Sequence, residues 1–191
     1  MSPAALWRGS LALALAGMLM ACDEGGQARL TELPEPQGAL TEELMIALGQ
    51  AKNYHHKADV YLSDGKPELA ERALSRLLEV PFPEGSPEAE DVLLDARARL
   101  AALRLGQGAI DDALATAEPG IAAAERESFF LANLYTVRGE IYEARAEALD
   151  AAEPADLEAA ERARRRALES YSRSIAINER LQERLMRETA R

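Results

Sequence analysis

The side chains best suited to acid–base or metal chemistry are the two histidines of the chain, His55 and His56. Neighbouring residues on a helix point about 100° apart, so this pair cannot bind one metal ion without further ligands. Asp59 lies four residues after His55, within reach on a helix, but acyl transfer would also need a nucleophile, and no serine motif supplies one. We therefore predict no enzyme, no metal and no cofactor, and keep a metal-binding or hydrolytic module that uses both histidines as an alternative.

The only cysteine, Cys22, directly follows an apolar run from Leu11 to Ala21. The one charged residue before this run is Arg8, and its eleven residues fall short of the ~20 needed to span a bilayer. A positive start, a short apolar stretch and a small residue at its end are typical of a secretory signal peptide. Because Cys22 has no second cysteine to pair with, the exported part is not predicted to be an internal disulfide scaffold.

Leu19-Met20-Ala21-Cys22 resembles the lipobox of bacterial lipoproteins. The resemblance implies that residues 1–21 are removed as a signal peptide and that Cys22 becomes the lipid-modified first residue of the mature protein. Each buried CH₂ contributes about 0.8 kcal/mol, so several acyl chains together make a durable anchor. The lipobox resemblance also implies a location in the bacterial cell envelope, facing the periplasm. It does not distinguish the inner from the outer membrane. A plain signal peptide and an uncleaved hydrophobic anchor are the alternatives.

Charge is distributed unevenly along the chain, whose formal net charge is −11. Residues 157–191 carry nine arginines and six glutamates, so the excess of negative charge lies before them. An acidic body argues against nucleic acid as a partner and against flat docking on anionic lipid. Abundant Ala, Leu, Glu and Arg, without the alternation of a strand, predict an all-α fold.

Residues 22–40 contain paired glycines and two prolines but no apolar periodicity, which predicts a flexible tether. Thr41, followed by two glutamates, is typical of a helix N-terminus, because its hydroxyl can cap free N–H groups and acidic residues suit the positive end of the helix dipole. We therefore predict a helical domain over residues 41–191.

Early in this domain, small and aromatic residues fall close to the spacing of a tetratricopeptide repeat (TPR), a pair of antiparallel helices. In this resemblance Ala58 and Ala70 are small because the two helices approach closely. Tyr61 and Leu74 fill the space between the helices, and Asp64-Gly65 forms the turn. The matching residues are Tyr54, Ala58, Tyr61, Gly65, Ala70, Leu74 and Leu77.

Two more degenerate helix pairs follow. Ser86-Pro87 is expected to begin the second, whose helices meet at Gly106-Gln107-Gly108, a turn without the lysine and preceding strand of a phosphate loop. In its second helix Pro119 predicts a break or kink near Ala117. The residues that match the third pair are Tyr135, Gly139 and Tyr142, then Ala167, Tyr171 and Ile175.

The third pair is expected to begin near Ser128 and contains an insertion, which predicts that both of its helices extend to a turn at residues 153–156. The final helix should then run from about Leu157 to near Arg187. Together the three pairs resemble an antiparallel helix-pair solenoid of TPR type with an extended C-terminal helix, and about three pairs is the minimum for a stable stack.

In such a stack the first helix of each pair lines a concave groove, where some TPR proteins clamp a C-terminal carboxylate with lysines and asparagines. Here Asp59 and Glu140 stand at asparagine positions, which favours a basic or apolar peptide. Near the C-terminus, residues 162–166 contain four arginines, which either bind an acidic partner or pair with Glu158 and Glu161 as ordinary helix surface. The candidate partner-binding residues are Lys52, His55, Asp59, Asn133, Glu140, Arg164, Arg165 and Arg166.

The sequence therefore predicts a membrane-anchored lipoprotein that acts as a protein–protein interaction scaffold or assembly factor. A pilotin-like or outer-membrane-assembly lipoprotein is the alternative within the same class. The expected partners are a protein or peptide and the membrane, with no nucleic acid and no small-molecule substrate.

Overall fold

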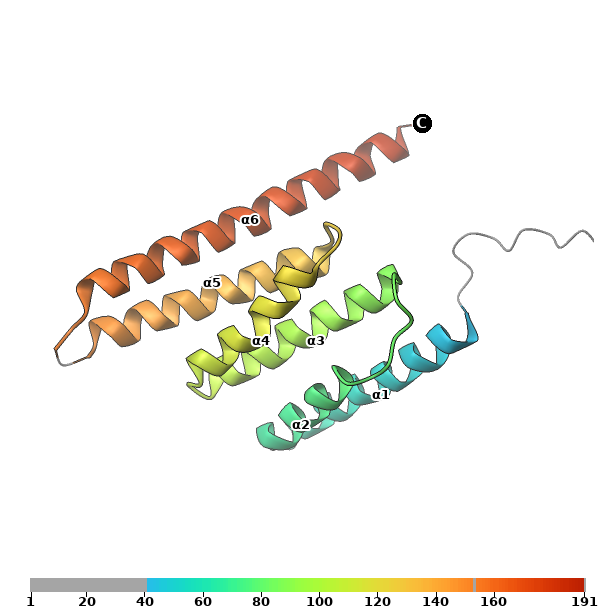
Figure 1. The fold of residues 1–191 in the computed structure, drawn as a ribbon, viewed down its shortest axis with the longest axis horizontal. Helices are drawn as coiled ribbons and strands as arrows, with labels where there is room; N and C mark the ends of the chain where they lie inside the picture. Colours follow the sequence, from blue (N-terminus) through green and yellow to red (C-terminus); the bar gives the residue numbers. More distant parts are fainter. Residues whose placement is uncertain (1–40, 153, 191) are drawn as a thin grey trace, which may run out of the picture. The chain divides into compact units, whose positions relative to one another are not determined.

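Six α-helices and no strand make up the part of the chain that the computed structural model describes, residues 41–152 and 154–190 (Figure 1). This confirms the predicted all-helical class for those residues. Cys22 and the predicted tether lie outside them. No helix in the described ranges combines the length and apolar character that crossing a membrane requires. The helices are α1 (Glu42–Ser63), α2 (Pro67–Leu77), α3 (Pro87–Gly106), α4 (Ile110–Ala123), α5 (Phe129–Asp150) and α6 (Leu157–Thr189).

Consecutive helices contact one another as three hairpins: α1 with α2, α3 with α4, and α5 with α6. Between hairpins, α3 contacts α1, α2 and α5, and α4 contacts α5. Among the described helices α6 contacts α5 alone, and its Arg180 also pairs with Glu127 in the segment between α4 and α5. With 33 residues α6 is the longest helix, and it follows α5 after a short connection, as the predicted extension of the third pair requires (Figure 1).

Three helices begin where the sequence predicts. The hydroxyls of Thr41, Ser86 and Ser128 each accept a backbone N–H bond from the residue three positions on, at 3.2 Å in all three cases. Pro87 is the first residue of α3, where its missing N–H removes no helical hydrogen bond. These starts depend only on neighbouring residues, so a local sequence signal suffices to locate them.

The turns within the first two hairpins also follow the prediction. Gly65 lies between α1 and α2 with φ 69°, and Gly108 lies between α3 and α4 with φ 79°. Side chains disfavour this left-handed backbone, whereas glycine adopts it without a steric penalty.

The core of the first hairpin confirms the close approach expected of its alanines. Ala58 and Ala70 are both fully buried, and they form one apolar cluster with Leu74 and the partly buried Tyr61. A larger cluster joins the second and third hairpins, with Leu134, Ile141 and Ile177 among its fully buried side chains. The largest apolar cluster of the described residues therefore joins the second and third hairpins.

The predicted break near Ala117 is wrong, because α4 continues through Pro119 to Ala123. Proline at this position removes the hydrogen bond to the carbonyl of Ala115. Both Pro119 and Ala115 are exposed, so water can replace the lost bond. Only one turn of helix follows Pro119, which limits the effect of the missing bond.

Ile175, expected to match the buried pattern of the third pair, is instead 58% exposed, whereas Ile177 is fully buried. The buried positions of α6 are Ala160, Ala163, Ala167, Ser170, Ser174 and Ile177, spaced by three or four residues. Ile175 falls between two of these positions, so it points away from α5.

Candidate partner-binding surface

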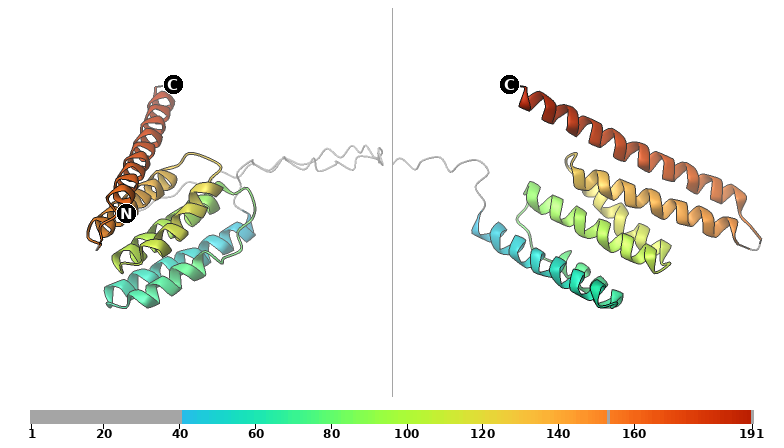
Figure 2. Two further views of the ribbon diagram at one scale, coloured as in Figure 1. Left: turned by 60° about the vertical axis from the view of Figure 1, so that its left-hand side comes forward. Right: turned by 180° about the vertical axis from the view of Figure 1, so that it is seen from behind.

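The first helices of the three hairpins lie next to one another, with α3 between α1 and α5 (Figure 2, right). Of the predicted residues, Lys52 and Asp59 are exposed on α1, and Glu140 is exposed on α5, where Asn133 is partly buried. We call the face of α1, α3 and α5 that carries these residues, together with Asp95 and Arg99 of α3 and Glu143 and Glu147 of α5, the first-helix surface. Its predicted members are Lys52, His55, Asp59, Asn133 and Glu140.

A polar cluster joins α1 to α3 on this surface, and Arg99 of α3 lies at its centre. One guanidinium nitrogen of Arg99, Nη1, donates to Nδ1 of His55 at 2.7 Å, and the other, Nη2, contacts the carboxylate of Asp59. On the far side of the imidazole, Nε2 of His55 lies 3.5 Å from Oδ2 of Asp95. The structure therefore brings His55 and Asp59 together through Arg99. This arginine is not among the partner-binding residues predicted from the sequence. The spacing of Arg99 four residues after Asp95 is the signal that could have identified it.

The geometry of the cluster favours a neutral His55. Since a guanidinium only donates, Nδ1 must accept, which assigns the imidazole proton to Nε2 on the side of Asp95. Burial and the positive charge of Arg99 lower the pKa of His55, while Asp95 and Asp59 act in the opposite direction. The neighbouring His56 is exposed, as expected for adjacent residues on a helix. Within the described ranges, no group of three or more His, Cys, Asp or Glu side chains is placed to hold a metal ion.

The α5 part of the first-helix surface is acidic. Glu140 and Glu147 are exposed, and neither forms an ion pair with a described residue. Glu143 accepts a 2.7 Å hydrogen bond from the hydroxyl of Tyr171 on α6. Burial and this bond raise the pKa of Tyr171 above its ordinary value. A partner that approaches α5 therefore meets unpaired carboxylates.

The predicted arginines lie apart from this surface, on α6, and each has a partner within the third hairpin. Arg164 contacts Asp150, and Arg165 lies 3.5 Å from Glu161. Arg166 donates to the hydroxyl of Tyr142 at 3.2 Å. All three remain exposed, so they are accessible from solvent while paired.

Comparison with known proteins found no matching protein family, curated protein or solved structure.

Proposed function

We propose that this protein is a lipid-anchored scaffold or assembly factor that binds another protein through a TPR-like stack of helix pairs. One observation carries the proposal: α3 contacts both α1 and α5, whereas in the described residues α2 does not contact α4, and α4 does not contact α6. The first helices α1, α3 and α5 thus contact one another in a row, whereas the second helices α2, α4 and α6 do not within the described residues. A curved stack of helix pairs has this arrangement. Such a stack presents its first helices as a continuous, largely preformed surface.

The chemistry of the first-helix surface favours a basic segment of the partner. Glu140 and Glu147 have no cationic partner among the described residues, and the Arg99 cation is already paired with Asp59. Opposite charge steers association and sets orientation, and like charge discourages acidic partners. The binding energy itself would come from the apolar and aromatic side chains that the partner adds.

The lipid on Cys22, implied by the lipobox resemblance, would raise the local concentration of the protein at the membrane. A flexible tether over residues 22–40 would let the helical domain reach a partner some distance from the bilayer. We place the domain on the periplasmic side of the cell envelope.

Crosslinking mass spectrometry on intact cells tests the binding surface. Glu140→Lys should remove crosslinks to the main partner, because it introduces a like charge where a basic segment binds. Glu68→Lys is the matched control, an equal charge reversal at an exposed residue of α2 outside the first-helix surface. Unchanged crosslinks in both variants, or equal loss in both, would contradict the proposal.

Fractionation tests the anchor separately. Cys22→Ser should shift the chain from the membrane fraction to soluble or unprocessed material, and the mature wild-type N-terminus should carry an acyl mass. Membrane retention of a correctly cleaved Cys22→Ser chain would show that lipid is not the anchor.

A further inference from the structure

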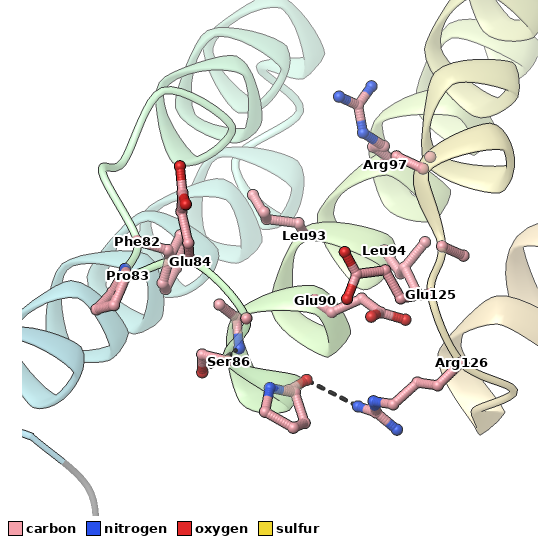
Figure 3. Close-up of a pocket in the computed structure, with 16 residues that line it drawn as sticks. Phe82, Pro83, Glu84, Ser86, Glu90, Leu93, Leu94, Arg97, Glu125 and Arg126 are labelled. Atoms are coloured by element: carbon pink, nitrogen blue, oxygen red, sulfur yellow. Dashed lines mark hydrogen bonds between the residues drawn. The ribbon is translucent and has the colours of Figure 1, made fainter.

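A cavity of about 500 Å³ lies between the segment that joins α2 to α3 and the end of α4 (Figure 3). Its volume falls within the range of roughly 300–1,000 Å³ that is typical of ligand sites. None of the residues predicted from the sequence to bind a partner lines this cavity.

The cavity and the first-helix surface use different faces of α3. Glu90, Leu93 and Arg97 line the cavity, and they recur at helical spacing along one face. Asp95 and Arg99 follow Leu93 and Arg97 by two residues each, which turns them by about 200° around the helix axis. The two surfaces can therefore bind independently.

The floor of the cavity is apolar and its sides are acidic. Phe82, Leu93 and Leu94 supply apolar surface. Glu84 stands on the side of the α2–α3 segment and Glu125 on the opposite side, with Leu93 between them (Figure 3). Such a combination suits a side chain with an apolar stem and a cationic head.

Glu90 carries the strongest signal for a cation. Its Oε1 atom is buried and has no hydrogen-bond partner among the described residues. A buried carboxylate oxygen needs a hydrogen-bond partner, which an ordered water, an ion or a cationic group of a ligand can supply. No described lysine or arginine lies within ion-pair distance of Glu90, although Arg97 and Arg126 line the same cavity.

These two arginines are already engaged with the protein but retain donors. Arg126 pairs with Asp91 and donates to the carbonyl of Pro87 at 2.7 Å, yet its Nε is buried without a partner. Arg97 donates one bond, to the carbonyl of Thr116 at 3.2 Å. A guanidinium has five N–H donors, so both side chains can donate to further carbonyl groups. The site thus offers an acceptor for a cation beside donors for a peptide backbone.

We propose that this cavity binds a peptide segment of a protein partner that carries an arginine or lysine side chain between apolar residues. The stem of that side chain lies on Leu93 and Phe82, its charged head pairs with Glu90, and a backbone carbonyl accepts from Arg126. This inference goes beyond the proposed function, because it concerns a different face of α3 and does not depend on the first-helix surface.

The test uses the full chain purified from membranes in detergent, with isothermal titration of acetyl-Ala-Leu-Arg-Leu-Ala-amide. The peptide should bind, and the same peptide with Gln in place of Arg should not. Glu90→Gln keeps the size of the side chain and should weaken binding about tenfold or more, because it removes the charge partner. Leu93→Lys should abolish binding, because its own ammonium group would occupy the site.

The matched control is Glu68→Gln, which removes a carboxylate from α2 and should leave the affinity unchanged. Equal affinity for the Arg and Gln peptides, or an unchanged affinity in a folded Glu90→Gln chain, would overturn the proposal. Equally tight binding of butylguanidinium alone would overturn the assignment to a peptide. A loss of binding in Glu140→Lys but not in Glu90→Gln would place the peptide on the first-helix surface and overturn the cavity site.

Discussion

The first and third hairpins join their helices by different chemistry. Between α1 and α2 the contact is made by small apolar residues, Ala58 and Ala70, and no side-chain hydrogen bond of the described residues joins the two helices. Polar bonds cross the interface of α5 and α6 in addition to apolar contacts such as those of Ile141 and Ile177. The polar bonds join Thr136 to Ser174, Arg138 to Ser170, Arg166 to Tyr142, and Tyr171 to Glu143.

The neighbours of each hairpin explain this difference. Both α1 and α2 contact α3, so a third helix covers the apolar surface that they leave open. Among the described helices α6 contacts only α5, with Arg180 also paired to Glu127 just before α5, and its outer face stays exposed, with Leu168 at 65%. A terminal helix depends on a single interface, where fully satisfied polar bonds specify one alignment. The two hairpins therefore differ in whether both of their helices, or only one of them, contact the middle hairpin.

Truncating a buried side chain in either hairpin should have the largest effect on stability. Ile177→Ala in α6 and Leu74→Ala in α2 each remove a side chain that is at most 1% exposed, and each should cost about 2–5 kcal/mol in the free energy of unfolding. Urea denaturation measures the cost. Hydrogen exchange should show that Ile177→Ala loosens α6 and α5, whereas Leu74→Ala loosens α1, α2 and α3. Faster exchange throughout the domain in both variants would show that the hairpins do not open separately.

Gly139→Ala should have the next largest effect. A Cβ at Gly139 would lie 2.5 Å from Cε1 of Tyr171, so the ring must move and its bond to Glu143 is strained or lost. Overpacking of this kind costs about 1–3 kcal/mol. The matched control is Gly49→Ala in α1, where nothing lies within 4 Å of the new Cβ. That change should stabilise the chain by about 0.5–1 kcal/mol, because glycine is unfavourable inside a helix. Melting temperatures that fall in both variants would contradict the close approach of Tyr171.

A double-mutant cycle on Thr136→Val and Ser174→Ala measures one polar bond of the third hairpin, where the two hydroxyl oxygens are 2.9 Å apart. Each single change should cost about 1 kcal/mol, and the double change should cost less than their sum. Ser75→Ala in α2, which removes a hydroxyl without a hydrogen bond in the described residues, should change stability by less than about 0.5 kcal/mol. Strict additivity in the cycle would show that this bond does not couple α5 to α6.

The smallest effect is a pH dependence that comes from His55, where the first hairpin contacts α3 of the second. Burial and Arg99 lower the folded pKa of His55 below its ordinary value of 6.5. As the pH falls below 6.5, His55 of the unfolded chain binds a proton before His55 of the folded chain does. The stability that neutral His55 contributes is therefore fully present above pH 6.5, and it is lost progressively as the pH falls to the folded pKa. His55→Gln should flatten the pH dependence of unfolding in that window, and His56→Gln should not. Identical pH curves for the wild type and His55→Gln would contradict the assignment.

Features set by neighbouring residues were predictable from the sequence. The helix starts at Thr41, Ser86 and Ser128 and the turns at Gly65 and Gly108 all follow from contacts within four residues along the chain. The buried alanines of the first hairpin were also predictable, because their spacing repeats with the period of a helix. These features define the first two helix pairs and the start of the third without any knowledge of how the pairs contact each other.

Within the candidate surfaces, the sequence identified His55 and Asp59 but not Arg99, which lies 40 residues beyond Asp59 along the chain. It also missed the cavity around Glu90, which needs the α2–α3 segment and the end of α4 on either side of α3. The exposure of Ile175 and the continuity of α4 through Pro119 likewise depend on which faces meet neighbours or water.

Helix starts, turns and the pairing of neighbouring helices follow from the amino-acid sequence, because periodicity and capping are local. Contacts between side chains of distant helices, the exposure of single apolar positions and the cavity beside α3 depend on how the helices pack. Burial and ion pairing are set by distances in space, and residues far apart in the sequence acquire those distances only when the helices come together.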